Sequence, residues 1–338
     1  MLRSEIRIDL GALRRNVRRL RRVLSGSELW AVVKADAYGH GALDCAPAAL
    51  AEGASALCVA TVPEALALRR ALPEARLIVM GPAAAEELAA AREARLELVV
   101  GEQIPDGVPV HVKLDTGMGR WGVSELASAP RALVGIMTHL ATADSDPAFA
   151  RVQLERFRAA TAGLEGLTRH AANSAAALAI PESRLDAARC GIALYGLSPF
   201  GGDPAADGLE PVLSWRSEIA RAHLLAPGES TGYGRAFRAE RETWIGIVPV
   251  GYADGFRRDL TGTEVLVSGR PSRVVGAVSM DAFAVELDAR PEPGEPVTIV
   301  GPGLLLEAHA RVAGTITYEL ASRIESRPTR ARRVVCGG

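Results

Sequence analysis

Residues 29–100 repeat one pattern, in which a short apolar run is followed by a helix-prone stretch. The runs are LWAVV (29–33), ALCVAT (56–61), RLIVM (76–80) and LELVV (96–100). The pattern continues with VPVHVKL (108–114), LVGIMTHL (133–140), TRHA (168–171) and DAARC (186–190). Near-continuous apolar strands that alternate with helices indicate a parallel sheet covered on both faces. Eight such units in about 200 residues fit an α/β fold of the (β/α)8 barrel type better than an open sheet.

The helices around this barrel are less regular than the strands. Apolar residues at three- and four-residue steps predict a helix over 10–24, and Ala-rich stretches predict helices over 84–95 and 147–165. Between the fourth and fifth runs lies GEQIPDG (101–107), which is too short for a helix. Either the outer ring has a gap there, or the fourth strand is misplaced.

The pattern changes after about residue 208. Stretches such as VLSWRSEI (212–219), TWIGIVPVGY (243–252) and TEVLVSG (263–269) alternate with a period of two and are separated by Gly and Pro. This alternation predicts a mainly antiparallel β domain. We therefore expect a barrel over 10–208 and a C-terminal β domain over 209–338, with residues 2–9 pairing with the latter.

Composition excludes several classes of protein. The 338 residues carry a formal net charge of −1, without the strongly basic balance of a nucleic-acid-binding domain. No apolar run approaches the ~20 residues that span a bilayer, and MLRSEIRIDL lacks the apolar core of a secretory signal. The four cysteines show no CxxC spacing, which is typical of reduced thiols in a cytoplasmic protein.

Lysine is rare in this chain and falls at informative positions. Of 39 basic residues only Lys34 and Lys113 are lysines. Arginine replaces lysine as a surface cation, but it cannot replace an amine that must become neutral and attack a carbonyl. Lys34 directly follows the first run, at the carboxyl end of a barrel strand, where barrel enzymes place their active sites.

Further polar and small residues follow the later runs. They are Arg120, His139, Ser174, Arg189, Gly191 and Ile192. The loops after the last two barrel strands commonly bind a phosphate, a role that Ser174, Gly191 and Ile192 fit. A phosphate subsite near a strand-end lysine suggests pyridoxal 5′-phosphate held as a Schiff base, although many barrel enzymes bind a substrate phosphate there.

The segment AVVKADAYGHGA (31–42) resembles the cofactor-attachment motif of alanine racemases. The resemblance covers nearly the whole chain in order, through KLDTGMGRWG (113–122), MTHLATAD (137–144), HAANSAA (170–176), RCGIALYG (189–196), TGYGRAF (231–237), VGYADG (250–255), SMD (279–281) and TYEL (317–320). It implies a barrel with a β domain, pyridoxal phosphate, and a homodimer whose sites are completed across the interface. It also implies racemisation of alanine, which supplies D-alanine for cell-wall peptidoglycan.

The resemblance also implies roles for individual residues. Lys34 carries the cofactor and acts as the base on the D-alanine side, while Tyr233 of a second subunit is the base on the L-alanine side. His139 would stabilise the phenolate of Tyr233, with Arg189 behind it. Arg189 would also face the pyridine nitrogen and keep it unprotonated. The implied phosphate-binding residues are Tyr38, Ser174, Gly191, Ile192 and Tyr318.

Substrate binding is implied for a second group of residues. Arg120 by its charge and Met280 by its backbone N–H match residues that place the substrate carboxylate. Tyr252 and Asp281 match entrance and near-site positions, with Asp281 as an organiser rather than a third base. Lys113 matches a lysine that is carbamylated in some members of the family. An ordinary salt bridge from Lys113 to Asp115 or another acid is the alternative.

Two other functions compete with this interpretation. A broad-specificity racemase acting on serine or larger amino acids would share every motif. A metal-dependent barrel hydrolase would use His139, His170 and Asp144, but no HxH follows the first strand and no HExxH occurs. We therefore expect no metal, no nucleic acid and no membrane partner.

Overall fold

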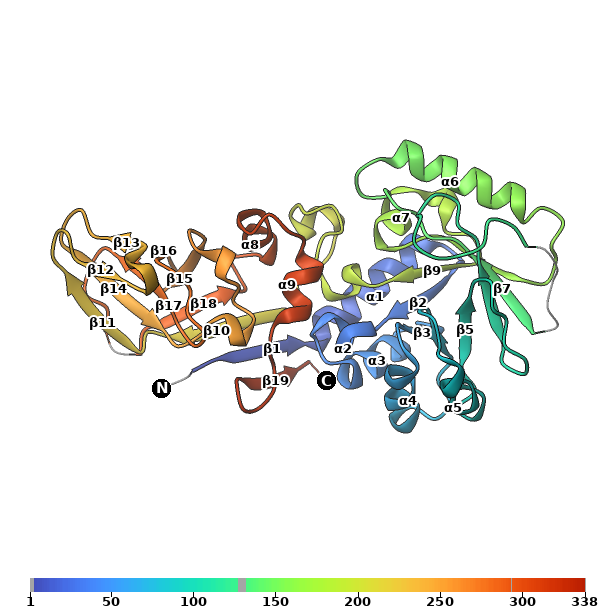
Figure 1. The fold of residues 1–338 in the computed structure, drawn as a ribbon, viewed down its shortest axis with the longest axis horizontal. Helices are drawn as coiled ribbons and strands as arrows, with labels where there is room; N and C mark the ends of the chain where they lie inside the picture. The colour runs from blue at the N-terminus through green and yellow to red at the C-terminus, as the bar shows by residue number, and fades with distance from the viewer. Residues whose placement is uncertain (1–2, 127–131, 293, 338) are drawn as a thin grey trace. The chain divides into compact units, whose positions relative to one another are not determined.

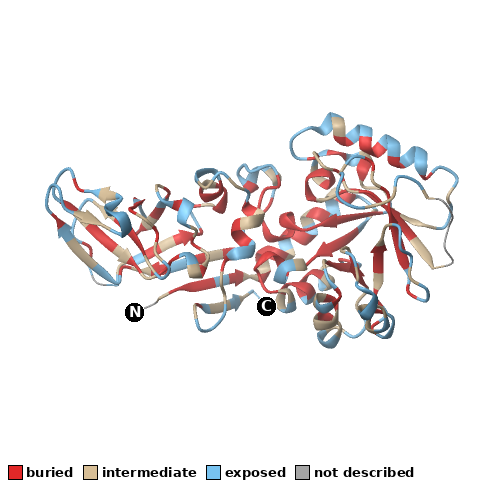
Figure 2. Cartoon of the chain, viewed as in Figure 1, coloured by how far each residue is buried: buried red, intermediate tan, exposed pale blue. Residues whose placement is uncertain are grey.

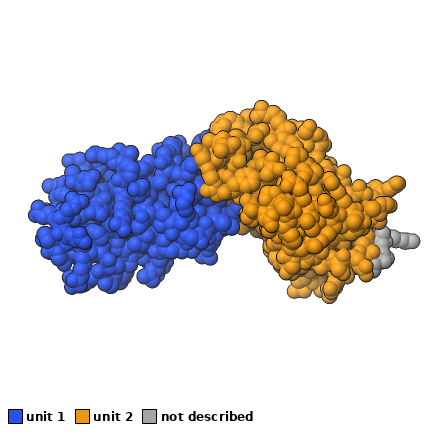
Figure 3. Space-filling model, turned by 90° about the horizontal axis from the view of Figure 1, so that it is seen from above, with its two compact units in different colours: residues 1–11, 211–338 blue, residues 12–210 orange. Residues whose placement is uncertain are grey.

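The structure is a computed structural model that describes residues 3–126, 132–292 and 294–337. The chain divides into two compact units, residues 12–210 and residues 1–11 with 211–338 (Figure 3). The first unit contains the expected barrel, and the second contains the expected β domain.

Residues 12–210 are built around a closed barrel of eight parallel strands (Figure 1). The strands follow one another around the barrel in chain order, and β9 pairs with β2 to close it, with Arg189 opposite Trp30. The strands are β2 (Glu28–Val32), β3 (Ala56–Val59), β4 (Leu77–Val79), β5 (Glu97–Val100), β6 (Val110–Lys113), β7 (Leu133–Met137), β8 (Thr168–His170) and β9 (Ala187–Cys190). All eight predicted runs form barrel strands, so the predicted fold class is confirmed for this unit.

Helices of uneven length accompany the strands. They are α1 (Leu10–Leu24), α2 (Lys34–Tyr38), α3 (Ala42–Ala51), α4 (Val62–Ala71), α5 (Leu88–Glu93), α6 (Pro147–Ala160) and α7 (Ser174–Ala179). In α1 the five apolar residues at helical spacing are buried, which explains why this arginine-rich segment folds as a helix. No helix lies in residues 101–109, between β5 and β6. Because β5 coincides with the fourth predicted run, the outer ring has a gap at this point.

The barrel strands are mostly apolar but carry buried histidine, lysine and arginine side chains. The strands themselves are largely buried (Figure 2). Among them His111, Lys113, His170 and Arg189 are at most 3% exposed. Burying a charged or polar group costs free energy unless it is hydrogen-bonded, so these side chains mark the part of the barrel that chemistry rather than stability requires.

The second unit is a nine-stranded sheet with the order β11-β14-β17-β16-β15-β18-β10-β1-β19. Its strands are β1 (Glu5–Asp9), β10 (Leu213–Glu218), β11 (Arg221–Leu225), β14 (Thr243–Val248), β15 (Glu264–Val267), β16 (Arg270–Val275), β17 (Phe283–Leu287), β18 (Pro296–Val300) and β19 (Arg332–Cys336). Neighbours are antiparallel except β1 and β19, which are parallel. The predicted mainly antiparallel domain is confirmed.

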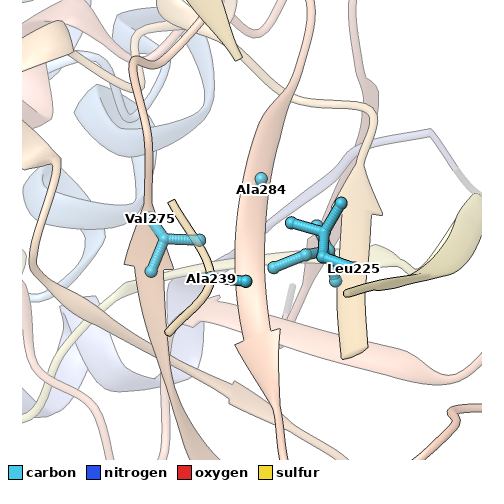
Figure 4. Close-up of a cluster of buried hydrophobic side chains, with 5 residues drawn as sticks. Leu225, Ala239, Val275 and Ala284 are labelled. Atoms are coloured by element: carbon cyan, nitrogen blue, oxygen red, sulfur yellow. The ribbon is translucent and has the colours of Figure 1, made fainter. Parts of the chain in front are cut away.

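Small apolar side chains form part of the core of this sheet. Leu225, Val275 and Ala284 come from β11, β16 and β17 and pack with Ala239 and Ile245 (Figure 4). A two-stranded ribbon, β12 (Ser230–Thr231) with β13 (Phe237–Arg238), and the helices α8 (Leu306–Val312) and α9 (Thr317–Arg323) complete the unit. The turn between β12 and β13 carries Tyr233.

Candidate active site

Lys34 begins α2, a single turn whose backbone is left-handed. Ala35, Asp36, Ala37 and Tyr38 have φ values of 51°, 50°, 56° and 55°. The left-handed conformation costs roughly 1–2 kcal/mol for each residue that has a side chain. Four successive residues in this conformation identify the turn as strained, and strain of this kind concentrates at functional sites.

Two carboxylates hold the turn in place. Glu64, in the first turn of α4, accepts a hydrogen bond from the backbone N–H of Ala35 at 2.7 Å. Asp36 accepts one from the N–H of Ala42 at 2.7 Å, which ties the turn to the start of α3. These bonds fix the backbone at Lys34, so its side chain starts from a defined position.

The Lys34 amine lacks a partner. The side chain is half-buried, and Nζ makes no hydrogen bond or ion pair within the described part of the chain. Burial, and then the positive charge of Arg120, lower the pKa of Lys34, and the smaller effect of the Glu64 charge raises it only in part. The amine therefore reaches its neutral, nucleophilic form at lower pH than a surface lysine.

Arg189, on β9, is buried and held by five short contacts. Nη1 donates to His170 Nδ1 at 2.8 Å and to the His170 carbonyl at 3.0 Å. Nη2 lies 2.9 Å from the Thr138 carbonyl, 3.0 Å from the Ala171 carbonyl and 3.3 Å from His139 Nδ1. Burial lowers the pKa of Arg189 to about 10, so it stays charged near neutral pH. Its Nε–H alone has no hydrogen-bond acceptor in the described ranges.

His139 follows β7, and its tautomer is fixed by Arg189. Because a guanidinium only donates hydrogen bonds, His139 Nδ1 must be the unprotonated nitrogen. Burial, reinforced by Arg189 and Arg120, lowers the pKa of His139 to about 3, so the ring is neutral. Its proton is therefore on Nε2, where it can be donated to an oxygen such as a phenolate.

Ser174, Gly191 and Tyr38 lie together, as the sequence motifs predict for a phosphate subsite. Ser174 Oγ accepts hydrogen bonds from the N–H groups of Gly191 at 3.0 Å and Ala193 at 3.4 Å. A methyl group on Gly191 would come within 2.4 Å of the Tyr38 hydroxyl, so only glycine fits there. Ile192 begins the short helical turn that follows.

These features fit pyridoxal phosphate. The unpaired amine of Lys34 suits an aldehyde, and the free Nε–H of Arg189 suits the lone pair of a pyridine nitrogen. The tight cradle at Gly191, with hydroxyls of Tyr38 and Ser174, suits a phosphate. Lys34, Arg189 and this cradle would hold the cofactor.

Arg120 is exposed and carries an unneutralised charge. It makes no ion pair to any described residue, and its guanidinium carbon lies 4.7 Å from the centroid of the Trp121 ring. A free guanidinium at this position suits a substrate carboxylate. Lys113 Nζ lies 5.4 Å from the same ring centroid.

Lys113 forms no ion pair with Asp115 or with another described acid, contrary to the salt-bridge alternative. Asp115 instead accepts hydrogen bonds from the backbone N–H groups of Gly117, Met118 and Gly119. Burial, with the charges of Arg120 and Arg189, lowers the pKa of Lys113 to about 8.

In the second unit, Tyr233 lies on the turn Tyr233–Arg235 with its side chain open to solvent. It is 75% exposed and has no hydrogen-bond partner among the residues described. Gly232 and Gly234 on either side have φ values of 77° and 68°, which favour glycine. The sequence around Tyr233 thus presents a phenol outward on a sharp turn.

Met280, Tyr252 and Asp281 lie close to one another in the same unit. The Tyr252 N–H donates to the Ser279 carbonyl, and the Ala253 N–H donates to the Met280 carbonyl, each at 3.0 Å. The N–H of Met280 bonds to nothing in the described ranges, so it is available to a carboxylate. Asp281 is paired with Arg330 at 2.9 Å, which fits an organising role. Tyr318 lies on α9.

The sequence did not identify Glu64 and Trp121 as residues that shape the site, and it suggested His170 only as a ligand of the competing metal-dependent hydrolase. Glu64 supports the left-handed turn, Trp121 contacts Arg120, and His170 fixes Arg189. His170 carried a signal, because it is a polar residue at the end of a predicted strand. No pattern connected Glu64 with Lys34, since the two are far apart in the chain.

The structure was also searched for a metal site, a membrane-spanning helix and disulfides. No cluster of three or more His, Cys, Asp or Glu side chains suited to a metal ion occurs among the described residues. No helix in that part of the chain is both long and apolar enough to cross a bilayer. None of the four cysteines, all within the described ranges, forms a disulfide.

Comparison with known proteins shows that the chain is similar to alanine racemases over nearly its whole length. The family models "Alanine racemase, N-terminal domain" and "Alanine racemase, C-terminal domain" match residues 8–199 and 212–332. The alanine racemase of Streptomyces coelicolor is 41% identical, over 98% of this chain and 96% of the relative. Its solved structure superposes with a TM-score of 0.92 at 40% identity, covering 100% of this chain and 99% of the other. A Bartonella henselae alanine racemase with covalently bound pyridoxal phosphate matches at 27% identity and a TM-score of 0.91, covering 99% and 100%.

Proposed function

The chain belongs to the alanine racemase family, and from this membership we propose that it interconverts L- and D-alanine with Lys34 and Tyr233 as two bases. The enzyme is an isomerase that depends on pyridoxal phosphate, and its family supplies D-alanine for the cell wall. The observation that carries the assignment of Lys34 is its unpaired, half-buried amine on a strained turn. Family models of alanine racemase match both halves of the chain, which argues against the metal-dependent hydrolase.

When bound, pyridoxal phosphate acidifies the Cα proton of an amino acid. Lys34 Nζ, with its lowered pKa, takes this proton from D-alanine or returns it on that face. Tyr233 Oη performs the same task on the L-alanine face. A phenol with an ordinary pKa near 10 is a weak base at neutral pH unless its phenolate is stabilised. The neutral His139 supports it by donating from Nε2, while Arg189 holds Nδ1 of that ring.

Arg120 and Met280 position the substrate carboxylate in this proposal. The first offers an unneutralised guanidinium and the second a backbone N–H without a partner. Tyr252 and Asp281 are assigned to entrance and near-site positions, and the ion pair of Asp281 with Arg330 supports an organising role for Asp281. Tyr38, Ser174, Gly191, Ile192 and Tyr318 are assigned to the cofactor phosphate.

We further propose that the working enzyme is a homodimer with shared active sites. The exposed phenol of Tyr233, which has no partner among the described residues, supports a role in the site of a second copy. Its place in the cell is proposed to be the cytoplasm, which is supported by four cysteines that form no disulfide.

The assignment is tested by absorbance, borohydride reduction and an assay. The purified protein with pyridoxal phosphate is expected to be yellow, and borohydride should fix the cofactor on Lys34, as peptide mass mapping would show. The same preparation should interconvert L- and D-alanine faster than L- and D-serine. Absence of alanine racemisation by the cofactor-loaded protein would overturn the proposal.

Lys113 is proposed to be carbamylated. With a pKa of about 8, about a tenth of its amine is neutral at pH 7, against fewer than about one in a thousand at an ordinary lysine pKa. Only the neutral amine adds to carbon dioxide, releasing a proton and leaving an anionic carbamate. That anion would be placed between Arg120 and the barrel and would orient the guanidinium.

With ¹³C-labelled carbon dioxide and cofactor-loaded protein, we expect a slowly exchanging carbamate carbon signal from the wild-type chain that is missing from Lys113→Ala. The signal should increase from pH 6 to pH 8, because deprotonation of the amine precedes the reaction. A wild-type spectrum at pH 8 that matches the Lys113→Ala spectrum would show that the lysine is unmodified.

A further inference from the structure

A continuous chain of hydrogen bonds leads from Arg189 through the interior of the barrel. Arg189 Nη1 lies 2.8 Å from His170 Nδ1, and His170 Nε2 lies 3.0 Å from His111 Nδ1. His111 Nε2 lies 2.7 Å from Glu97 Oε2. Arg189 and His170 are near the carboxyl ends of β9 and β8, whereas Glu97 is the first residue of β5. The chain therefore runs from the active-site end of the barrel to the opposite end.

The direction of every bond in this chain is determined. Arg189 can only donate, so His170 Nδ1 is unprotonated. Complete burial and the charge of Arg189 lower the pKa of His170 far below its usual range, so the neutral ring carries its proton on Nε2. That proton is donated to His111 Nδ1, which leaves the His111 proton on Nε2, facing Glu97. Three donors thus point one way and end on a carboxylate.

The carboxylate of Glu97 accepts the last hydrogen bond of this series and stays ionised. Burial alone raises the pKa of Glu97, but hydrogen bonds from His111 and Arg76 outweigh burial and lower the pKa to about 2. Arg76 contacts both carboxylate oxygens, at 2.8 and 2.9 Å. Because both oxygens of the carboxylate only accept, His111 must present an N–H to it.

The barrel makes room for the two imidazoles. His111 and His170 come from β6 and β8, which are separated by β7, and they meet across Gly135 of β7. A methyl group at position 135 would lie 2.1 Å from His111 Nδ1, so any side chain there would break the contact. Trp30 packs against both rings, with centroid distances of 5.6 Å to His111 and 4.5 Å to His170.

We propose that Glu97, His111 and His170 are positioning residues for Arg189, which fix its guanidinium by a one-way donor chain anchored at the opposite end of the barrel. The carboxylate sets the tautomers of both histidines, and His170 Nδ1 then holds Nη1 of Arg189. This would leave Arg189 Nε–H available to a cofactor nitrogen, while Nη2 stays against His139 Nδ1. The role of Arg189 rests on the proposed function, whereas the tautomers do not.

The tautomers are measured in the cofactor-free full-length chain, labelled with ring-¹⁵N histidine. The signals of His111 and His170 are assigned by their loss in the His111→Gln and His170→Gln variants. We expect neutral rings protonated on Nε2 at both positions. A proton on Nδ1 of either ring, or an imidazolium at either position, would overturn the proposal whether or not the protein racemises alanine.

A kinetic comparison tests the positioning role. Glu97→Gln replaces the carboxylate by an amide, which donates as well as accepts. The two histidines are then no longer held with their protons on Nε2. We expect kcat to fall about tenfold, as for loss of a hydrogen bond to a charged group. KM for alanine should change less than about twofold, because Arg189 does not bind the substrate carboxylate. Glu28→Gln is the matched control, since Glu28 also contacts Arg76, at 3.4 Å, but contacts neither histidine. Its hydrogen bond from Trp30 Nε1 is kept in this variant, because the amide oxygen of glutamine still accepts.

The two experiments distinguish failure of the positioning role from failure of the proposed function. Equal kcat values for Glu97→Gln and Glu28→Gln would refute the positioning role even if the tautomers are as expected. A wild-type protein with the expected tautomers but without racemase activity would refute the proposed function and leave the donor chain standing.

Discussion

In the Lys34→Ala variant, racemisation of alanine should fall at least about 10³-fold, the range lost with a catalytic acid–base group. The physical reason is that the chain contains no second amine suited to this position. The other lysine, Lys113, is buried inside the barrel. The measurement is the initial rate in both directions, with circular dichroism to show that the variant folds.

Isotope exchange shows which face of the reaction Lys34 serves. In D₂O the Lys34→Ala variant, loaded with cofactor, should exchange the Cα proton of L-alanine through Tyr233 but form no D-alanine. Exchange of D-alanine should be lost, because its base is absent. Equal loss of both exchanges would show that Lys34 is needed for loading or folding rather than for proton transfer on one face.

Lys34→Arg is the informative companion. It keeps the positive charge, but arginine does not become a neutral nucleophile at working pH. Methylamine added to Lys34→Ala should restore part of the activity, because the truncated side chain leaves space for it. Methylamine should not rescue Lys34→Arg, where that space is filled. Activity in Lys34→Arg near that of the wild type would contradict the assignment.

The barrel strands were predictable because each is a short apolar run, and burial of such runs inside a closed sheet is the main driving force of the fold. Helix α1 was also predictable, since five apolar residues recur at helical spacing and are buried. The missing helix between β5 and β6 was one of the two alternatives that the short length of residues 101–107 left open. In each case the structure follows from the residues within that one segment.

The turn after Lys34 was not predictable in the same way. Ala35, Ala37 and Tyr38 have no local preference for a left-handed backbone, which favours glycine. The conformation is stabilised by Glu64, which is 29 residues away and reaches the turn only when β2, β3 and α4 are assembled. A tertiary contact therefore overrides local propensity here.

The series of hydrogen bonds from Arg189 to Glu97 inside the barrel could not be predicted from the sequence, for a related reason. His111 lies in a predicted apolar run, and its contact with His170 depends on both β8 and the absence of a side chain at Gly135. The role of Glu97 then follows from the orientation of two imidazoles. Such information exists only in the closed barrel, because no two of these residues are close in sequence.

The exposed phenol of Tyr233 leads to the second large effect. In the Tyr233→Phe variant, racemisation should fall about 10²–10³-fold, because the ring is retained and only the acid–base oxygen is lost. Deuterium exchange should be the mirror image of that in Lys34→Ala. D-alanine should exchange its Cα proton through Lys34, while L-alanine should not.

A mixed assembly of the two inactive variants tests whether Tyr233 acts in the site of a second copy. Lys34→Ala and Tyr233→Phe chains are co-expressed with different tags, and assemblies carrying both tags are purified. If each site combines Lys34 of one chain with Tyr233 of the other, one of two sites in such a dimer is intact, so about half the wild-type activity should return. If both groups act within one chain, every site lacks one base and the mixed assembly must stay inactive. Activity recovered only with both tags present therefore requires a site shared between subunits.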